Sequence, residues 1–273
     1  GRQGVVQFDG TNFSRLTRKD GLPAGVITCI RVVGDGRVWF GTAEGLVALY
    51  DGRSFTYYDL FSDLTGRKNR AANGQCWEIQ QGPDGATWFG AAEGLYRFEE
   101  TTFQHFTALD GLPEGSVNTL LALPSGGLAA GISTNGVTLL QGQRIQTNPN
   151  QRPVTDMVRG PDGHVWMAFS STQHPLRSLE FIDRGIPVAV LTNFSGLPTG
   201  RITCLAYATN GDLWAGGAGG GVIRFHGTQA TPTLVATHGL MANAINVIHC
   251  DPRGVVWIGA EGGIVRFDGA TWT

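Results

Sequence analysis

One short pattern recurs along the chain and constrains its fold more than any other feature. The clearest copy, DGRVWFGTAEGL, begins at Asp35, and DGATWFGAAEGL begins at Asp84. The copies are anchored at six positions, which hold Trp39, Trp88, Ala129, Trp166, Trp214 and Trp257. The anchors lie about forty to fifty residues apart, a period typical of solenoids, propellers and other repeat arrays.

Each repeat divides into four short strands bounded by turns. In the first complete repeat, apolar and β-branched residues at 26–32 predict a first strand, and the Asp-Gly pair at 35–36 predicts a tight turn. Further strands are expected at 38–42, 46–50 and 55–58. Four antiparallel strands per repeat, with no helical pattern, are typical of a propeller blade. We therefore predict an all-β fold, a β-propeller of four-stranded blades in a single domain over residues 1–273.

The strands do not fill a whole number of blades. First strands and Trp-position strands each occur six times, whereas the third strand occurs seven times, from 4–10 to 263–269. A six-bladed ring closes if residues 11–17 supply the outer strand that is missing after Trp272. A seven-bladed ring needs two further inner strands. We predict six blades, with a seven-bladed ring as the alternative.

The repeated tryptophan is interpreted as a packing residue between blades. A large indole at the same place in each repeat fills the interface between neighbouring sheets, and its N–H is expected to meet a carbonyl group. The copy at Ala129 loses this side chain.

The four cysteines, Cys29, Cys76, Cys204 and Cys250, all fall on first strands and follow no zinc-binding spacing. We interpret them as buried free thiols. The alternative is a bridge between neighbouring blades, for example from Cys29 to Cys76 or Cys250.

Charge and hydropathy argue against two classes of partner. The net charge is −2 with the basic residues scattered, which gives no electrostatic footprint for nucleic acid. No apolar run approaches the roughly eighteen residues that a membrane span needs, so no membrane insertion by this segment is expected. The chain opens directly on repeat sequence, which we interpret as a cut from a longer protein, with removal of a leader as the alternative.

The order of the motifs resembles a known repeat family. Trp-x-Gly-Thr-x-x-Gly-Leu is followed by Phe/Tyr-Asp-Gly-x-x-Phe, Asp-Gly-Leu-Pro and Val/Ile-x-x-Ile, best carried by residues 4–50, 88–120 and 202–273. This order resembles the two-component regulator propeller repeat. The resemblance implies the extracytoplasmic (periplasmic) ligand-sensing part of a hybrid two-component receptor, without its membrane span and kinase. The chain departs from the pattern at Ala129, at the insertion 59–75 and in the blade containing 170–187.

Candidate binding residues are those that break the repeat on the first strands. Where the first blade has Thr28, the others have Trp77, Asn118, Thr155, Thr203 and Asn246. Where it has Cys29, the others have Glu78, Thr119, Asp156, Cys204 and Val247. Thr28 and Cys29 thus mark two positions at which Trp77, Glu78 and Asp156 stand out.

We predict a small-molecule pocket at the channel mouth, in which Trp77 stacks on a flat ligand face. Its polar contacts would come from Glu78, Asp156, Arg152, Arg201, Asn118 and Asn246. One aromatic ring with a few convergent polar groups suits a small-molecule site. In the alternative, Trp77 packs between blades and the carboxylates pair with nearby arginines. The insertion at 61–75 is interpreted as a solvated loop, with a mobile lid as the alternative.

The histidines do not favour an enzyme. They are scattered over strands and turns with no HxH or HExxH spacing, at His105, His164, His174, His226, His238 and His249. We predict no catalytic residue, metal or cofactor, and a small-molecule ligand or a partner protein on the connector face. The alternatives are a protein–protein interaction scaffold and a metal-dependent propeller lyase or hydrolase, with His174 and Glu93 as its first candidates.

Overall fold

The structure is a computed structural model that describes most of the chain. The described residues are 4–60, 74–124, 126–134, 136–142, 144–147, 152–169, 179–183, 186–191, 201–218, 221–226, 229–233, 244–260 and 262–273. Their contacts divide into two compact units, Gly1–Pro149 and Asn150–Thr273, which are taken separately below. The insertion over 61–73, and also His174 and His238, lie outside the described residues.

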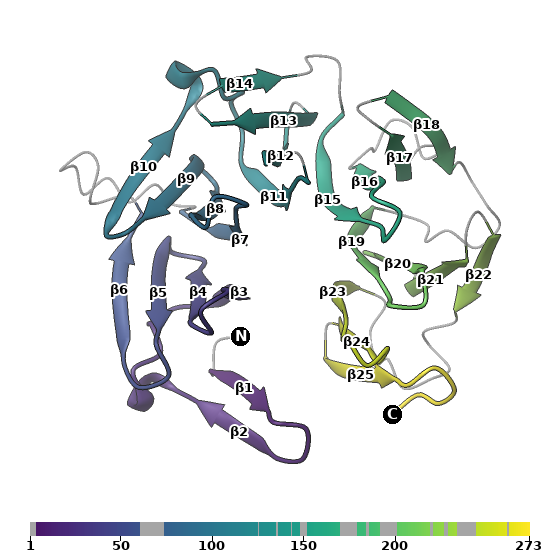
Figure 1. Ribbon diagram of the computed structural model, residues 1–273. Coiled ribbons are helices and arrows are strands. Elements are labelled where there is room, and N and C mark those ends of the chain that lie inside the picture. The colour runs from purple at the N-terminus through teal and green to yellow at the C-terminus, as the bar shows by residue number, and fades with distance from the viewer. Residues whose placement is uncertain are drawn as a thin grey trace. The chain divides into compact units, whose positions relative to one another are not determined.

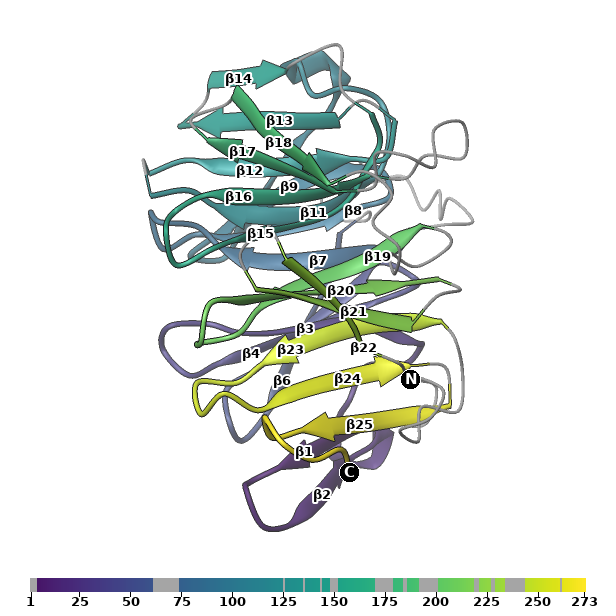
Figure 2. The same ribbon diagram turned by 90° about the vertical axis from the view of Figure 1, so that its right-hand side faces the viewer.

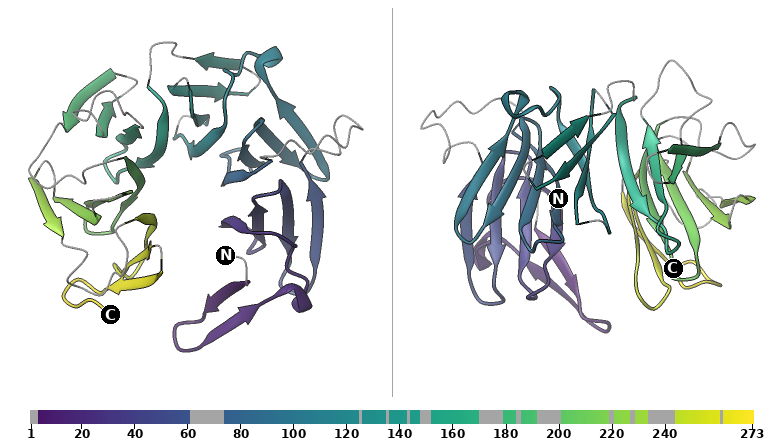
Figure 3. Two further views of the ribbon diagram at one scale, coloured as in Figure 1. Left: turned by 180° about the vertical axis from the view of Figure 1, so that it is seen from behind. Right: turned by 45° about the horizontal axis from the view of Figure 1, so that its top comes forward.

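Unit 1 contains three four-stranded antiparallel sheets preceded by a hairpin of β1 (Val5–Phe8) and β2 (Phe13–Leu16) (Figures 1 and 3). The sheets follow chain order: β3 (Ile27–Val32), β4 (Val38–Thr42), β5 (Leu46–Tyr50) and β6 (Phe55–Asp59); β7 (Cys76–Gln81), β8 (Thr87–Ala91), β9 (Gly94–Glu99) and β10 (Thr102–Phe106); β11 (Val117–Ala122), β12 (Leu128–Ile132), β13 (Gly136–Gln141) and β14 (Arg144–Thr147).

Unit 2 contains two further four-stranded sheets and one of three strands (Figure 2). Their strands are β15 (Val154–Arg159), β16 (Val165–Phe169), β17 (Leu179–Asp183) and β18 (Ile186–Leu191); β19 (Ile202–Tyr207), β20 (Asp212–Gly217), β21 (Gly221–His226) and β22 (Gln229–Thr233); β23 (Ile245–Cys250), β24 (Val256–Ala260) and β25 (Gly263–Phe267). The backbone of Thr273 exchanges two hydrogen bonds with Arg266 on β25, which begins a fourth strand of the last sheet.

The prediction of a β-propeller built from four-stranded antiparallel blades is confirmed. Within each unit, the first strands of neighbouring sheets lie against one another: β3 against β7, β7 against β11, β15 against β19 and β19 against β23. Each sheet then runs outward in chain order, as Figure 1 shows for β3 to β6 and for β7 to β10. Residues 13–16, expected to serve as an outer strand, pair with β1.

The conformation of the Asp-Gly-Leu-Pro connector is set by local hydrogen bonds. A single 3-10 turn, η1 (Arg18–Asp20), begins at Thr17, whose hydroxyl accepts a bond from Lys19 N while Asp20 accepts one from the Thr17 backbone. This is a capping box. Gly21 ends the turn with φ +93°, a conformation that glycine adopts without steric cost, and Leu22 is then buried. The turn η2 (Ala108–Asp110) repeats the arrangement.

The repeated tryptophan packs between neighbouring sheets, as predicted. Trp39 is 1% exposed, and its ring meets Phe89 and Phe98 of the next sheet edge-on, with centroids 5.0 and 5.1 Å away. The expectation of a carbonyl partner for the indole N–H is wrong at Trp214, whose buried Nε1 has no hydrogen-bond partner among the described residues. Trp214 is enclosed by apolar side chains and by Phe267 and Trp272, which offer no acceptor.

Candidate functional site

The position singled out on the first strands is a β-bulge in all six of them. In each strand the pairing register shifts across one residue, and the six residues are Thr28, Trp77, Asn118, Thr155, Thr203 and Asn246. A bulge leaves its extra residue out of the ladder and redirects its side chain. The residues at this position therefore share one backbone irregularity in all six first strands.

Threonine at the bulge joins neighbouring sheets. Thr28 Oγ1 lies 3.1 Å from Gly41 O in its own sheet and 2.6 Å from Cys76 O in the next sheet. Thr203 Oγ1 likewise meets Gly216 O and Ile245 O, and Thr155 Oγ1 donates to Ile202 O at 2.8 Å. We call this contact the threonine clasp.

The threonine clasp should contribute measurably to stability. We expect Thr28→Val, which keeps the shape but removes the hydroxyl, to lower the free energy of unfolding by about 1–3 kcal/mol, because the one O–H shared between the Cys76 and Gly41 carbonyl groups is lost. The matched control is Thr56→Val on β6, where Thr56 is exposed and a change within about 0.5 kcal/mol is expected. Urea unfolding of both variants measures the difference, and equal losses would contradict the clasp.

Trp77 occupies the bulge position without making a clasp. Its side chain carries no hydroxyl, and the residue is 42% exposed. The other six tryptophans, all in the described part of the chain, are buried or half-buried. Trp77 therefore presents a large apolar ring to solvent at a place where three other blades use a clasping threonine.

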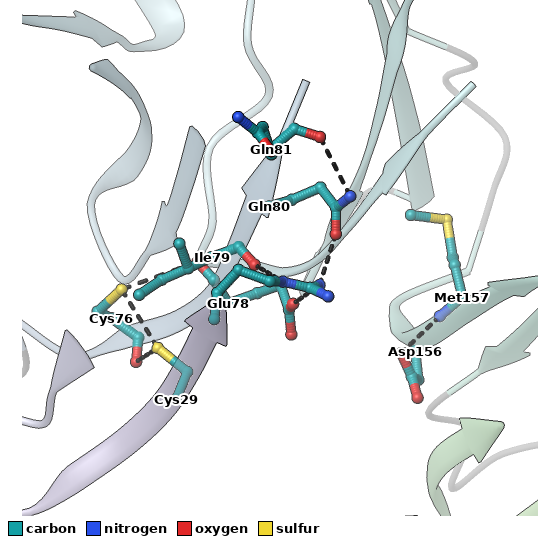
Figure 4. A network of polar contacts seen from close by, with 9 residues as sticks. Cys29, Cys76, Glu78, Ile79, Gln80, Gln81, Asp156 and Met157 are labelled. Carbon is teal, nitrogen blue, oxygen red and sulfur yellow. Dashed lines mark hydrogen bonds and ion pairs between the residues drawn. The ribbon is translucent and has the colours of Figure 1, made fainter. Parts of the chain in front are cut away.

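Beside Trp77, Glu78 forms an ion pair with Arg31 of the neighbouring sheet. Arg31 Nη2 lies 2.8 Å from Glu78 Oε1 and also donates to Gln80, while Arg31 Nε donates to Ile79 O at 2.7 Å (Figure 4). One guanidinium from β3 thus binds three consecutive residues of β7. Both side chains stay about a third exposed, 38% for Arg31 and 31% for Glu78.

Arg31 was missed in the sequence. It does carry a signal, because it is the only charged residue of its first strand. The pairing of Glu78 with an arginine matches the alternative stated above, although the partner is a residue that had not been considered.

Asp156 joins two first strands of unit 2. One carboxylate oxygen accepts from Met157 N at 2.8 Å, and the other accepts from Leu205 N on β19 at 2.7 Å. Arg152 places its guanidinium carbon 4.3 Å from the centroid of the Phe169 ring, a cation–π contact. Arg201 and Asn246 are exposed on or before first strands of the same unit.

The predicted residues divide between the units. Trp77, Glu78 and the half-buried Asn118 belong to unit 1, whereas Asp156, Arg152, Arg201 and Asn246 belong to unit 2. Within unit 1 the structure brings Trp77 and Glu78 together on one strand and adds Arg31. We call Trp77, Glu78 and Arg31 the β7 cluster.

Unit 1 also has a small pocket between its second and third sheets. It measures about 210 Å³, and its lining includes Asp84, Trp88, Arg97, Phe106, Leu128 and Leu140. Trp88 lies in a buried cluster with Ala130 and Leu140, whereas Phe89 and Phe98 enclose Trp39.

This pocket offers little to a ligand. Its floor is nearly closed, since Trp88 and Phe106 are each 5% exposed and stack on each other. Arg97 already pairs with Asp84 and Glu99, so it contributes no free charge. The volume is also below the roughly 300 Å³ or more of typical ligand pockets.

Within the described residues, no group of three or more His, Cys, Asp or Glu side chains is placed to hold a metal ion. The backbone carbonyl of Glu93, a first candidate for an enzyme, lies 3.1 Å from His105 Nε2. No helix in the described part of the chain has the length and apolar character to span a bilayer.

Comparison with known proteins gives one sequence match and many structural ones. A family model described as "Two component regulator propeller" matches residues 21–44, from the Gly-Leu-Pro connector to the Trp39 strand. No curated protein matches the chain in sequence.

Three solved structures share the fold. Inactive H270A virginiamycin B lyase from Staphylococcus aureus, with quinupristin, is 16% identical, with TM-score 0.71 over 94% of this chain and 85% of that one. YCF48 bound to D1 peptide is 13% identical, with TM-score 0.63 over 91% and 80%.

The third is the extracellular domain of BT4673 from B. thetaiotaomicron, described as a one component system. It is 18% identical, with TM-score 0.54 over 100% of this chain and 39% of that one. A second structure of this domain, described as part of a hybrid two component system, gives a TM-score of 0.51. At these identities the likeness concerns the fold, which hosts many activities.

Proposed function

The chain carries the two-component regulator propeller repeat, and we propose that it is a non-catalytic, ligand-binding part of a receptor of that kind. The repeat at 21–44 supports this assignment, as does the shared fold of the extracellular domain from B. thetaiotaomicron. The chain spans 39% of that domain's length, so receptor function is proposed for the larger protein. An extracytoplasmic, periplasmic location forms part of the same proposal.

The exposed ring of Trp77 is the observation that carries the binding proposal. A bulge position that is half-buried where it holds threonine carries a tryptophan that is 42% exposed, next to an ion pair that is about one-third exposed. Such a ring binds the flat face of a small molecule, and Arg31 and Glu78 can bind its polar groups. Asn118, Asn246, Asp156, Arg152 and Arg201 stay predicted contributors to ligand binding.

Removing the ring should weaken ligand binding. We expect Trp77→Ala to reduce affinity at least tenfold, because buried tryptophans commonly dominate binding energy, while Trp77→Phe should retain part of it. A thermal-shift screen of sugars, amino acids and small anions supplies the ligand, and calorimetry measures the affinity. Unchanged affinity in Trp77→Ala, with an unchanged circular dichroism spectrum, would remove this residue from the site.

Two other functions are distinguished by the same screen. A protein–protein scaffold is suggested by the fold of YCF48, which was solved with a bound peptide, and a propeller lyase is suggested by the fold of the S. aureus enzyme. The scaffold would show no small-molecule hit, and the lyase would consume its ligand. The β7 cluster contains no histidine, which favours binding over lyase chemistry.

We propose six blades for the chain, with seven as the alternative. Six first strands and six second strands occur among the described elements, in support of six. The third strand occurs seven times there, counting β1 and β25, which keeps seven as the alternative.

A further inference from the structure

Two cysteines of unit 1 face each other across the joint between its first and second sheets. Cys29 on β3 and Cys76 on β7 have their sulfur atoms 3.6 Å apart, and the Cys29 thiol donates toward Cys76 (Figure 4). Both are free thiols, with Cys76 fully buried and Cys29 half-buried. We infer that Cys29 and Cys76 form a disulfide that links the two sheets under oxidising conditions.

The surrounding contacts hold the two strands in place for this bond. On one side of the pair, Thr28 Oγ1 lies 2.6 Å from Cys76 O, and on the other Arg31 Nε donates to Ile79 O at 2.7 Å. The sulfur atoms must approach from 3.6 Å to about 2.05 Å. Because both flanks of the pair are fixed to the neighbouring strand, this change falls mainly on the two side chains.

Gly41 on β4 leaves room for both sulfur atoms. A Cβ at Gly41 would lie 2.5 Å from Cys29 Sγ and 2.9 Å from Cys76 Sγ. At the matching place in unit 2, Gly216 borders Cys204 on one side and Ile245 on the other, so only one sulfur is present. Cys204 therefore serves as an internal control.

The reaction is a thiol–disulfide exchange with a small-molecule disulfide as the oxidant. The more exposed Cys29 thiolate attacks one sulfur of the reagent RS–SR, forms a mixed disulfide and releases RS⁻. Cys76, after losing its proton, attacks Cys29 Sγ and releases the second RS⁻. Two thiols are oxidised, one reagent disulfide is reduced to two thiols, and the two protons pass to the released thiolates.

The order of attack follows from the environment of each thiol. The hydrogen bond with Cys29, together with burial, raises the pKa of the Cys76 thiol well above its ordinary value. Thiolate is the nucleophile, so Cys76 is suited to the second step, which takes place inside the pair.

Mapping of thiols after oxidation tests the inference. The whole chain is incubated with glutathione disulfide and then denatured, free thiols are blocked with N-ethylmaleimide in the denaturant, and tryptic peptides are analysed without reduction. We expect peptides 20–31 and 71–97 to be joined, with Cys204 and Cys250 alkylated. The melting temperature should rise by about 5–10 °C, since the link closes a long loop.

Two variants keep the test independent of folding. Cys29→Ser should abolish both the joined peptide and the rise in melting temperature, whereas Cys204→Ser should leave both unchanged. Alkylation of Cys29 and Cys76 after oxidation would overturn the inference. A glutathione adduct that persists on Cys29, a bridge to another cysteine or a disulfide between two molecules would also overturn it.

Discussion

Replacing Trp39 with alanine should cost about 3–5 kcal/mol of unfolding free energy, the range found for large aromatic side chains in cores. Trp39 is 1% exposed and meets Tyr58 of its own sheet as well as Phe89 and Phe98 of the next. Its loss leaves a cavity at the joint between two sheets, lined by rings that cannot easily collapse into it. Denaturant unfolding measures this cost.

The matched control is the same substitution at Trp77. Because Trp77 is 42% exposed, its replacement by alanine should change stability by less than about 1 kcal/mol. The two variants thus separate a tryptophan that packs sheets from one that is available for binding. If Trp77→Ala destabilised the protein as strongly as Trp39→Ala, Trp77 would be a packing residue.

Replacing Asp212 with alanine should also have a large effect, about 3 kcal/mol of unfolding free energy at neutral pH. The Asp212 side chain is 1% exposed and binds Arg224 and His226 of β21, as well as Asn210 at 2.7 Å. In Asp212→Ala these three side chains no longer have the buried carboxylate that they share as a hydrogen-bond and ion-pair partner. The matched control is Asp35→Ala, because Asp35 pairs with Arg37 but is 49% exposed, and a loss within about 1 kcal/mol is expected there.

The loss of unfolding free energy caused by Asp212→Ala should depend on pH, and its direction follows from the pKa of Asp212. Burial acts to raise the pKa of Asp212, but hydrogen bonds from His226, Asn210 and Arg224 outweigh it and hold the pKa below 3.8. A carboxylate with a depressed native pKa stabilises the fold above its unfolded value and loses that contribution as pH falls through its native value. The difference in unfolding free energy between wild type and Asp212→Ala should therefore be largest at pH 6 and should shrink below pH 3.8. A difference that grew in acid would contradict this account.

Much of the fold followed from the spacing of the repeat. The strand expected at 38–42 is β4, and those at 46–50 and 26–32 match β5 and β3 to within one residue. Period and turn chemistry fix such features locally, since each strand is bounded by its own glycine or Asp-Gly turn. The pairing of β2 with β1 does not follow from the sequence, because the residues of a strand do not determine which neighbouring strand it will pair with.

The candidate site could be located but not explained from the sequence. Aligning the first strands identified the position of Thr28 and Trp77, which the structure makes a bulge. It could not reveal the threonine clasp, the reach of Arg31 across β7 or the backbone partners of Asp156. Those depend on side-chain conformations and on contacts between sheets, which a period in the sequence does not encode.

The exchange of a clasp for Trp77 has a consequence for how a repeat protein could transmit a signal. In such proteins each repeat contacts mainly its immediate neighbours, so the stability of the protein is approximately a sum of the free energies of the repeats and of the interfaces between them. The first joint of unit 1 has the Thr28 hydroxyl, whereas the second has an indole in its place. A molecule that covers this indole would add its binding free energy at the joint that lacks the threonine clasp. Ligand binding would then make the interface between the two blades stiffer, and neither blade would have to change its shape.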